Sequence, residues 1–155
     1  MKSLLKTLLV LASVSLVGGG LAACGAMTPR QEASNGYRVQ KVVYHFNNAQ
    51  KADAGLHNIM NHLNAVGEKN TRIVVVTHGK GIDFLLDGWK DKNGKSYEGL
   101  VQELANRGVE FDVCANTLKG RKIDKNRVNL VAKIVPSGVA TVAELQQEGY
   151  AYVKP

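Results

Sequence analysis

Cys114 is the side chain whose position in the sequence best suits chemistry. Apolar and acidic residues alternate from Val109 to Val113, the period of a half-buried strand, and the alternation ends at Cys114 in residues that favour a helical turn. The N–H groups of a helix starting there would stabilise a thiolate, with added positive potential from Lys119 and Arg121. The alternative is that Cys114 is an inert, small buried hydrophobe, as free cysteines often are.

Two histidines also stand at the ends of predicted strands. His45 ends the β-rich segment 39–46, and His78 ends the continuous apolar run 72–78. In a parallel sheet these ends share one edge with Cys114, so the two imidazoles and the thiolate could converge into a ligand set that suits zinc or copper. No closely spaced HxxxH or CxxC pair is present. The sequence therefore predicts no cofactor, with zinc or copper at these three residues as the alternative.

Other common chemistries lack their motifs. The turn Gly79-Lys80-Gly81 has neither the spacing of a phosphate-binding loop nor that of the dinucleotide fingerprint, and no GxSxG marks a serine hydrolase. The formal net charge of +7 suits anionic ligands, but the basic residues are scattered and no aromatic residues interleave with them. Nucleic-acid binding is therefore not expected.

The N-terminal segment predicts export. Two lysines precede an apolar run from Thr7 to Val17, which is too short for a comfortable membrane span and typical of a secretory signal. Leu21-Ala22-Ala23-Cys24 resembles the lipobox of bacterial lipoproteins, in which the cysteine receives diacylglycerol before cleavage. Cleavage would remove residues 1–23 and anchor the protein to the membrane through Cys24. An ordinary signal cut nearby, giving a soluble periplasmic protein, is the alternative.

Lipidation would decide both the location and the redox chemistry. Gly25 stands where lipoproteins held at the inner membrane carry aspartate, so the resemblance implies the outer membrane, with the domain facing the periplasm. Cys24 would be consumed by lipid, and Cys114 would be the only thiol left of the two cysteines. Residues 24–38 have no apolar period and predict a flexible tether, which at full extension reaches about 45 Å.

From residue 39 onwards, strand and helix signals alternate. Asn47 and Asn48 offer helix caps, Ala52 to Val66 has apolar residues at helical spacing, and Thr141 to Glu144 has the pattern of a capping box. Strands are expected at 39–46, 72–78, 109–113, 130–135 and 150–153, and helices at 52–66, 82–86, 97–107 and 141–148. This order predicts one domain, residues 39–155, built as a three-layer α/β/α sandwich with a mostly parallel sheet of about five strands.

These elements and three motifs together resemble the DsrE/DsrF-like family of sulfur-relay proteins, over roughly Val39 to Pro155. The motifs are the turn at 77–81, the step from strand to cysteine at 111–116 with the Leu-Lys-Gly that follows it, and the ending at 135–139 and 149–153. The resemblance implies that Cys114 carries sulfur as a persulfide. It also implies a homo-oligomer, either a trimer or a hexamer.

The expected export departs from that family, whose sulfur-relay members are cytosolic and hand sulfur to dedicated partners. An exported protein would not meet those partners, so the sulfane sulfur donor and acceptor stay open. The sequence predicts a periplasm-facing lipoprotein whose DsrE-like domain transfers sulfur or performs thiol redox chemistry through Cys114. The alternatives are a metal-binding module and a non-catalytic oligomeric binding protein.

Overall fold

The computed structural model of the chain describes residues 36–155. The predicted signal segment 1–23, the lipidation residue Cys24 and the tether up to residue 35 lie outside the described residues. Of the helices within residues 36–155, none is long and apolar enough to cross a membrane.

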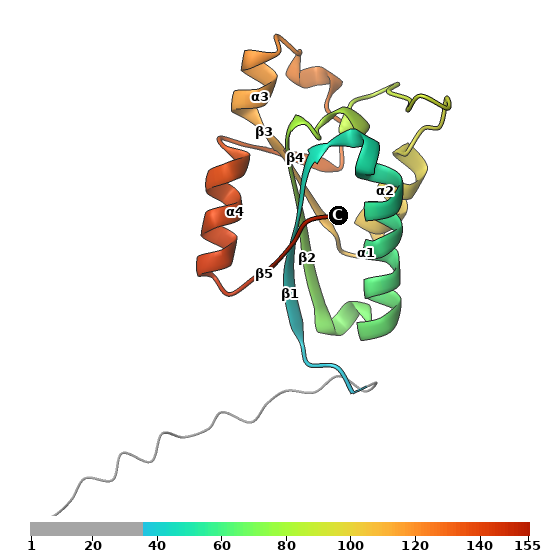
Figure 1. Cartoon of the computed structure of the whole chain (residues 1–155), viewed down its shortest axis with the longest axis vertical. Helices are drawn as coiled ribbons and strands as arrows, with labels where there is room; N and C mark the ends of the chain where they lie inside the picture. Colours follow the sequence, from blue (N-terminus) through green and yellow to red (C-terminus); the bar gives the residue numbers. More distant parts are fainter. Residues whose placement is uncertain (1–35) are drawn as a thin grey trace, which may run out of the picture.

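Within the described residues, five strands form one sheet in which every neighbouring pair is parallel (Figure 1). The strands lie in the order β4-β3-β2-β1-β5. Their bounds are β1 Gln40–Asn48, β2 Thr71–Lys80, β3 Glu110–Cys114, β4 Ala132–Val135 and β5 Ala151–Val153. The pairing of Val43 with Val74 sets β1 and β2 side by side in the same direction. The parallel α/β sheet expected from the sequence is therefore confirmed.

Helices cover both faces of this sheet, which gives the expected three layers. Helices α1 (Ala52–Val66) and α2 (Glu98–Asn106) lie on one face, and α4 (Gly138–Gln147) lies on the other, while α3 (Ala115–Gly120) follows β3 near one end of the sheet (Figure 1). Four short 3-10 helices complete the described part: η1 Ala49–Lys51, η2 Glu68–Asn70, η3 Asp83–Leu85 and η4 Lys125–Arg127.

The two layers of helices bury apolar clusters of unequal size. The larger cluster lies between the sheet and helices α1 and α2. The smaller one lies between the sheet and α4 and consists of Val43, Val74, Val76, Val142 and Tyr150. Strand β2 contributes to both clusters, because successive side chains of a strand point to opposite faces. Burial on both faces explains why β2 is an unbroken apolar run. It also places the end of β2, around His78, under α4.

Two local expectations are corrected by the structure. Helix α4 begins at Gly138, three residues before the capping box expected at Thr141, because the Ser137 side chain accepts a hydrogen bond from the Ala140 N–H at 3.4 Å and caps the helix there. The alternation in β3 predicts a half-buried strand, less fully covered than Ile73 to Val76; Glu110 is exposed as expected, but Asp112 is only 6% exposed. Burial by the neighbouring strands and α4 therefore overrides the polar pattern.

Candidate functional site

His78 and Cys114 are neighbours across the boundary between β2 and β3. Thr77 pairs with Val113 in the parallel register, and each site residue directly follows one of these two. Both side chains also approach Gly138 at the start of α4. A Cβ built on Gly138 would lie 3.3 Å from the Cys114 Cβ and 3.4 Å from the His78 Cβ. The missing side chain of Gly138 is what lets α4 start this close to both residues.

Hydrogen-bond donors from two helix starts surround the thiol of Cys114, which is the N-cap residue of α3 and 5% exposed. Burial raises the pKa of this thiol, but contacts from the Gly138 N–H, the Thr117 hydroxyl and the N–H groups of Thr117 and Asn116 outweigh that effect, so the pKa lies below its ordinary value. The sulfur makes no regular cap hydrogen bond in α3. The donors therefore act together as a polar cradle that favours the thiolate.

The Thr117 hydroxyl is held in place from the opposite side. Gly79, directly after His78, donates its N–H to the Thr117 Oγ1 at 3.0 Å. With its oxygen accepting that bond, the hydroxyl hydrogen is free to point at the Cys114 sulfur. Gly79 has a φ of +57°, a left-handed conformation that glycine adopts without steric cost. The Gly-Lys-Gly segment noted in the sequence thus positions a donor rather than binding phosphate.

His45 stacks on His78 at the same face of the sheet. Their ring centroids are 4.7 Å apart, and the His45 Nδ1 lies 2.7 Å from the Tyr152 hydroxyl of β5. Burial, then the charges of His78 and Lys154, lower the pKa of His45. Burial followed by Lys154 lowers the pKa of His78 in the same direction. Both imidazoles therefore favour the neutral form.

The Nε2 of His45 is buried and has no hydrogen-bond partner among the described residues. Buried polar atoms are normally satisfied, so this nitrogen is an unfilled acceptor or donor beside the stacked pair. Within residues 36–155, however, no three His, Cys, Asp or Glu side chains group closely enough to hold a metal ion. The structure brings His45 to His78, and His78 to Cys114, without assembling the three into one such cluster.

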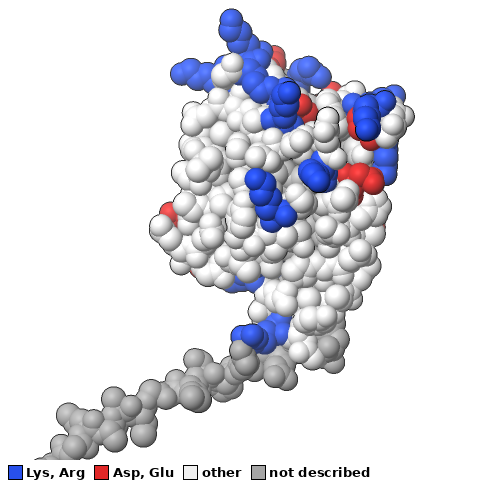
Figure 2. Space-filling model, in the orientation of Figure 1, with Lys and Arg blue, Asp and Glu red and all other residues white. Residues whose placement is uncertain are grey.

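The two basic residues expected near the thiol lie differently from each other. Arg121 donates to the Gly79 carbonyl oxygen at 2.9 Å and forms an ion pair with Asp83, so it ties the end of α3 to the segment after β2. Lys119 is exposed on α3. Neither side chain is among the groups that lower the pKa of Cys114. Lysine and arginine side chains do gather at the end of the molecule where α3 lies (Figure 2), which makes that end attractive to anions.

Three residues that shape the site were not identified from the sequence. Thr117 stands three positions after Cys114, where the helix N–H faces an N-cap side chain, so the capping rule could have indicated it. Gly138 and Tyr152 reach the site only through the strand order and the close approach of α4. No local signal in the sequence reveals those two contacts.

The fold and the site indicate a class of protein with a cysteine-centred site. The domain is an all-parallel α/β sandwich, and it holds a thiol of lowered pKa at the carboxyl edge of its sheet. Residues 40–155 match the family model described as the DsrE/DsrF-like family. The chain therefore belongs to the DsrE/DsrF-like family, as its motifs suggested.

Two solved structures are similar in fold. The protein of unknown function MTH1491 from Methanobacterium thermoautotrophicum is 29% identical, with a TM-score of 0.66, and the match covers 75% of this chain and 99% of that one. The ychN protein from E. coli is 16% identical with a TM-score of 0.63 and the same coverage, and this likeness shows the fold alone. None of the curated proteins compared matches the sequence.

Proposed function

We propose that this protein is a sulfur carrier in which Cys114 accepts sulfane sulfur as a persulfide and passes it on. The observation that supports this best is the thiol's lowered pKa, which arises from hydrogen-bond donors on α3 and α4 despite burial. Because the thiolate is the nucleophile in sulfur chemistry, donors that lower the pKa of the Cys114 thiol favour the form that attacks.

The proposed transfer needs no outside oxidant or reductant. The Cys114 thiolate attacks the terminal sulfur of a donor hydropersulfide, R–S–SH. A sulfur–sulfur bond forms to Cys114, the donor's sulfur–sulfur bond breaks, and R–S⁻ leaves with that electron pair while the proton stays on the transferred sulfur. The acceptor thiolate then repeats the step and releases the Cys114 thiolate. The same N–H and hydroxyl donors make Cys114 a good leaving group in this second step.

The stacked histidines suit a supporting role in this chemistry. His78 adjoins Cys114, and burial keeps its pKa low, so its neutral imidazole is able to take the proton from an incoming thiol. His45 stacks on His78, and the Tyr152 hydroxyl holds the His45 ring through its Nδ1. Lys119 and the basic end around α3 would draw anionic sulfur donors towards the sheet edge.

Alkylation and mass spectrometry test the proposal directly. The metal-free protein is incubated with polysulfide, and the expected product is Cys114 bearing the mass of one added sulfur atom, with none on Cys114→Ser. The alkylation rate is then measured against pH, and the thiol should react near neutral pH. Reactivity that appears only above about pH 8.5, the unperturbed value for cysteine, together with no sulfur adduct, would overturn the proposal.

The same assay separates sulfur transfer from the metal-binding alternative. Zinc or copper added before alkylation would protect Cys114 if it shares a metal with His45 and His78, and His45→Ala or His78→Ala would abolish that protection. Unchanged alkylation in the presence of either metal excludes the metal site. An inert thiol with neither adduct nor protection would instead indicate a non-catalytic binding protein.

We also propose that the protein is exported and held at the outer membrane, facing the periplasm, by lipid on Cys24. The support is the lipobox-like Leu21-Ala22-Ala23-Cys24 after an apolar signal, with Gly25 in place of an inner-membrane aspartate. Cys24→Ala should stall processing or release the protein from the membrane fraction. Unchanged mass and fractionation of this variant would contradict the anchor.

A homo-oligomer, trimer or hexamer, is the assembly we propose. The edge strand β4 leaves Ile134 39% exposed, and the start of α4 leaves Val139 63% exposed. Edge strands with apolar side chains are commonly covered by a partner. Light scattering that gives a monomer at micromolar concentration would contradict this assembly.

A further inference from the structure

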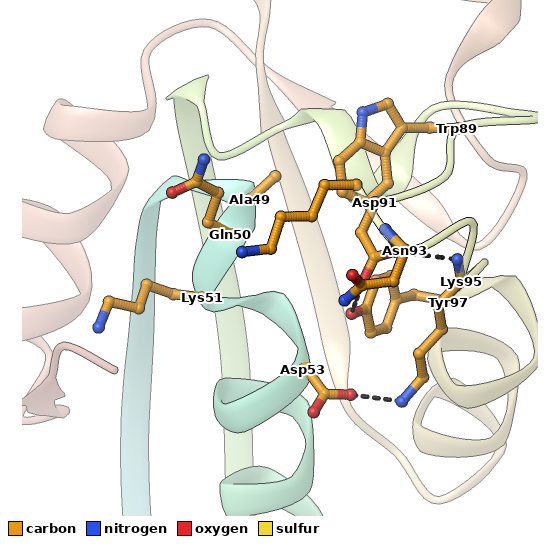
Figure 3. Close-up of a pocket in the computed structure, with 10 residues that line it drawn as sticks. Ala49, Gln50, Lys51, Asp53, Trp89, Asp91, Asn93, Lys95 and Tyr97 are labelled. Carbon is orange, nitrogen blue, oxygen red and sulfur yellow. Dashed lines mark hydrogen bonds and ion pairs between the residues drawn. The ribbon is translucent and has the colours of Figure 1, made fainter.

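Two hollows on opposite faces of the sheet differ in how their carboxylates are satisfied. In the hollow between η1 and the loop before α2, Asp53 forms an ion pair with Lys95 (Figure 3). Asp91 of the same hollow accepts hydrogen bonds from the Tyr97 hydroxyl and from two backbone N–H groups. The other hollow, of about 470 Å³, lies between α4 and strands β2 to β4 and contains a buried carboxylate without such contacts.

The hollow under α4 is open because, among the helices that the structure describes, α4 alone lies on this face of the sheet (Figure 1). Val74 pairs with Glu110 and Asp112 with Lys133 in the parallel register, so side chains of three strands point to this face. Helix α4 adds a wall of residues spaced three and four apart. These residues are Ala140, Thr141, Glu144 and Leu145.

Asp112 is the residue of this hollow that most needs an explanation. It is only 6% exposed, yet within residues 36–155 its carboxylate forms no ion pair and accepts no hydrogen bond. Burial raises the pKa of Asp112, the charge of Lys133 lowers it, and that of Glu110 raises it. A buried carboxylate without a donor is unfavourable. A ligand that brings a positively charged donor into the hollow would therefore stabilise this group.

Lys133 stands beside Asp112 without binding it. The two residues are partners in the register of β3 and β4, and the Lys133 side chain is exposed, but no ion pair joins them in the part of the chain that the structure describes. A carboxylate and an ammonium that stand side by side match the head of an α-amino acid, which carries an ammonium and a carboxylate on one carbon. The ligand's ammonium would contact Asp112, and its carboxylate would contact Lys133.

The remaining charges leave one further carboxylate available on α4. Arg72 and Glu110 form an ion pair at 3.3 Å. Lys41 donates to the Glu148 carbonyl oxygen at 2.8 Å, which places an ammonium at that end of the hollow. Glu144 is exposed and forms no ion pair within the described residues. This additional carboxylate favours a ligand with a second positive charge.

We propose that this hollow binds a basic α-amino acid such as lysine or arginine. Its α-ammonium binds Asp112, its α-carboxylate binds Lys133, and the cation of its side chain binds Glu144, with the aliphatic stem over Leu145. Each charge of the ligand then meets an opposite charge of the hollow, and the buried carboxylate gains a donor. The proposal does not rest on the function proposed for Cys114.

A set of related ligands tests the three contacts. Full-length protein is titrated calorimetrically at low salt with lysine, arginine, cadaverine and norleucine. Cadaverine lacks the carboxylate of lysine, and norleucine lacks its side-chain ammonium. Both should bind about tenfold more weakly than lysine, because each loses one hydrogen bond between charged groups. Equal affinities for lysine, cadaverine and norleucine, or no saturable binding of lysine and arginine, would overturn the proposal.

Matched variants assign each contact to its residue. Lys133→Gln should remove the preference for lysine over cadaverine, and Glu144→Gln the preference for lysine over norleucine. Asp112→Asn, which keeps the shape of the side chain, should weaken lysine about tenfold. Glu103→Gln removes an exposed carboxylate on α2, on the other face of the sheet, and should leave the affinity unchanged. Preferences that persist in Lys133→Gln and Glu144→Gln would contradict the assignment.

Light scattering on the same samples separates a ligand site from a contact between copies of the chain. If a basic side chain of a second copy occupies the hollow, Asp112→Asn and Glu144→Gln should lower the mass of the assembly, and lysine should not bind to the natural protein. That result would overturn the amino-acid site. Weaker lysine binding at an unchanged mass, with unfolding in urea at the natural concentration, would support it.

Discussion

The N–H of Gly79 and the hydroxyl of Thr117 are joined by a hydrogen bond of 3.0 Å that links the end of β2 to the first turn of α3. A hydroxyl that accepts this bond has one hydrogen left to donate, and the Cys114 sulfur lies within its reach. The left-handed φ of Gly79 aims the N–H at Thr117. The hydroxyl that faces the thiol is thus held by the end of a strand that does not contain Cys114.

Replacing Thr117 should weaken the thiolate. Thr117→Val keeps the shape but removes the hydroxyl, so the pKa of Cys114 should rise and its alkylation rate at pH 7 should fall about tenfold, because a hydrogen bond to a charged group contributes ~1.5–3 kcal/mol. Thr117→Ser keeps the hydroxyl and should behave like the natural protein. Alkylation with iodoacetamide across a pH series measures both variants. Equal rates for Val and Ser at this position would contradict the role of the hydroxyl.

A methyl group on Gly138 should disturb the same site from the side of α4. Its Cβ would lie 3.2 Å from the Thr77 carbonyl oxygen and 3.3 Å from the Cys114 Cβ, closer than packed atoms normally approach. Gly138→Ala should therefore lower the free energy of unfolding by about 1–3 kcal/mol, as overpacking does, and slow alkylation as α4 shifts away from the sulfur.

Gly99→Ala in α2 is the matched control, because a Cβ there would meet no atom within 4 Å. This variant should be more stable by about 0.5–1 kcal/mol, the helix preference of alanine over glycine. Urea denaturation measures both variants. A Gly138→Ala protein that is as stable and as reactive as the natural one would show that the close start of α4 is not needed.

The size of the reagent should decide how fast Cys114 reacts. With only 5% of the residue exposed, a slender reagent such as methyl methanethiosulfonate should reach the sulfur far more readily than a bulky aromatic disulfide. The ratio of the two rates is compared in the folded protein and in urea, where burial no longer discriminates. Equal ratios in both conditions would mean that the sulfur opens freely to solvent and that slender donors have no advantage.

The sequence predicts the architecture because its local signals agree with one another. The apolar run at Ile73 to Val76 shows a strand buried on both faces, and the glycines at 67 and 108 end helices with left-handed φ values of 90° and 89°. Each of these signals acts within a few residues, so no knowledge of strand order is needed. Cys114 is identified in the same way, because the alternation of apolar and acidic residues from Val109 to Val113 ends there.

The contacts around Cys114 depend instead on the order of strands. His45 meets Tyr152 only because β5 returns to the edge of β1, and Gly138 meets Cys114 only because α4 crosses over β3. Arg121 shows the opposite case: its position near Cys114 in sequence suggests a role for its charge at the thiolate, while its ion pair with Asp83 directs that charge elsewhere. Sequence proximity to Cys114 predicts that a helix follows it. It does not predict which partner a long side chain such as that of Arg121 contacts.

Three partly buried histidines, His45 and His78 in the sheet and His62 on α1, should make the protein less stable in mild acid. Burial is the leading cause that lowers the pKa values of His45, His62 and His78 in the folded protein. In the unfolded chain a histidine takes up its proton near pH 6.5. Between that pH and the lower folded values, the unfolded state binds more protons than the folded state. The free energy of unfolding should therefore be constant above about pH 7 and fall as the pH drops below about 6.5.

Comparing variants isolates the contribution of His45, whose ring faces His78, Tyr152 and Lys154. His45→Gln should show a shallower fall in stability between pH 7 and pH 5 than the natural protein, as measured by urea denaturation at each pH.

The exposed His57 on α1 provides the matched control for loss of an imidazole, as His57→Gln. Burial raises the pKa of Asp112, which acts in the opposite direction on acidification, but this contribution is common to all three proteins and cancels in the differences. Parallel curves for the natural protein and His45→Gln would show that charging of the stacked pair does not contribute to the acid sensitivity. A shallower curve in His45→Gln but not in His57→Gln would locate that sensitivity at the imidazole beside His78.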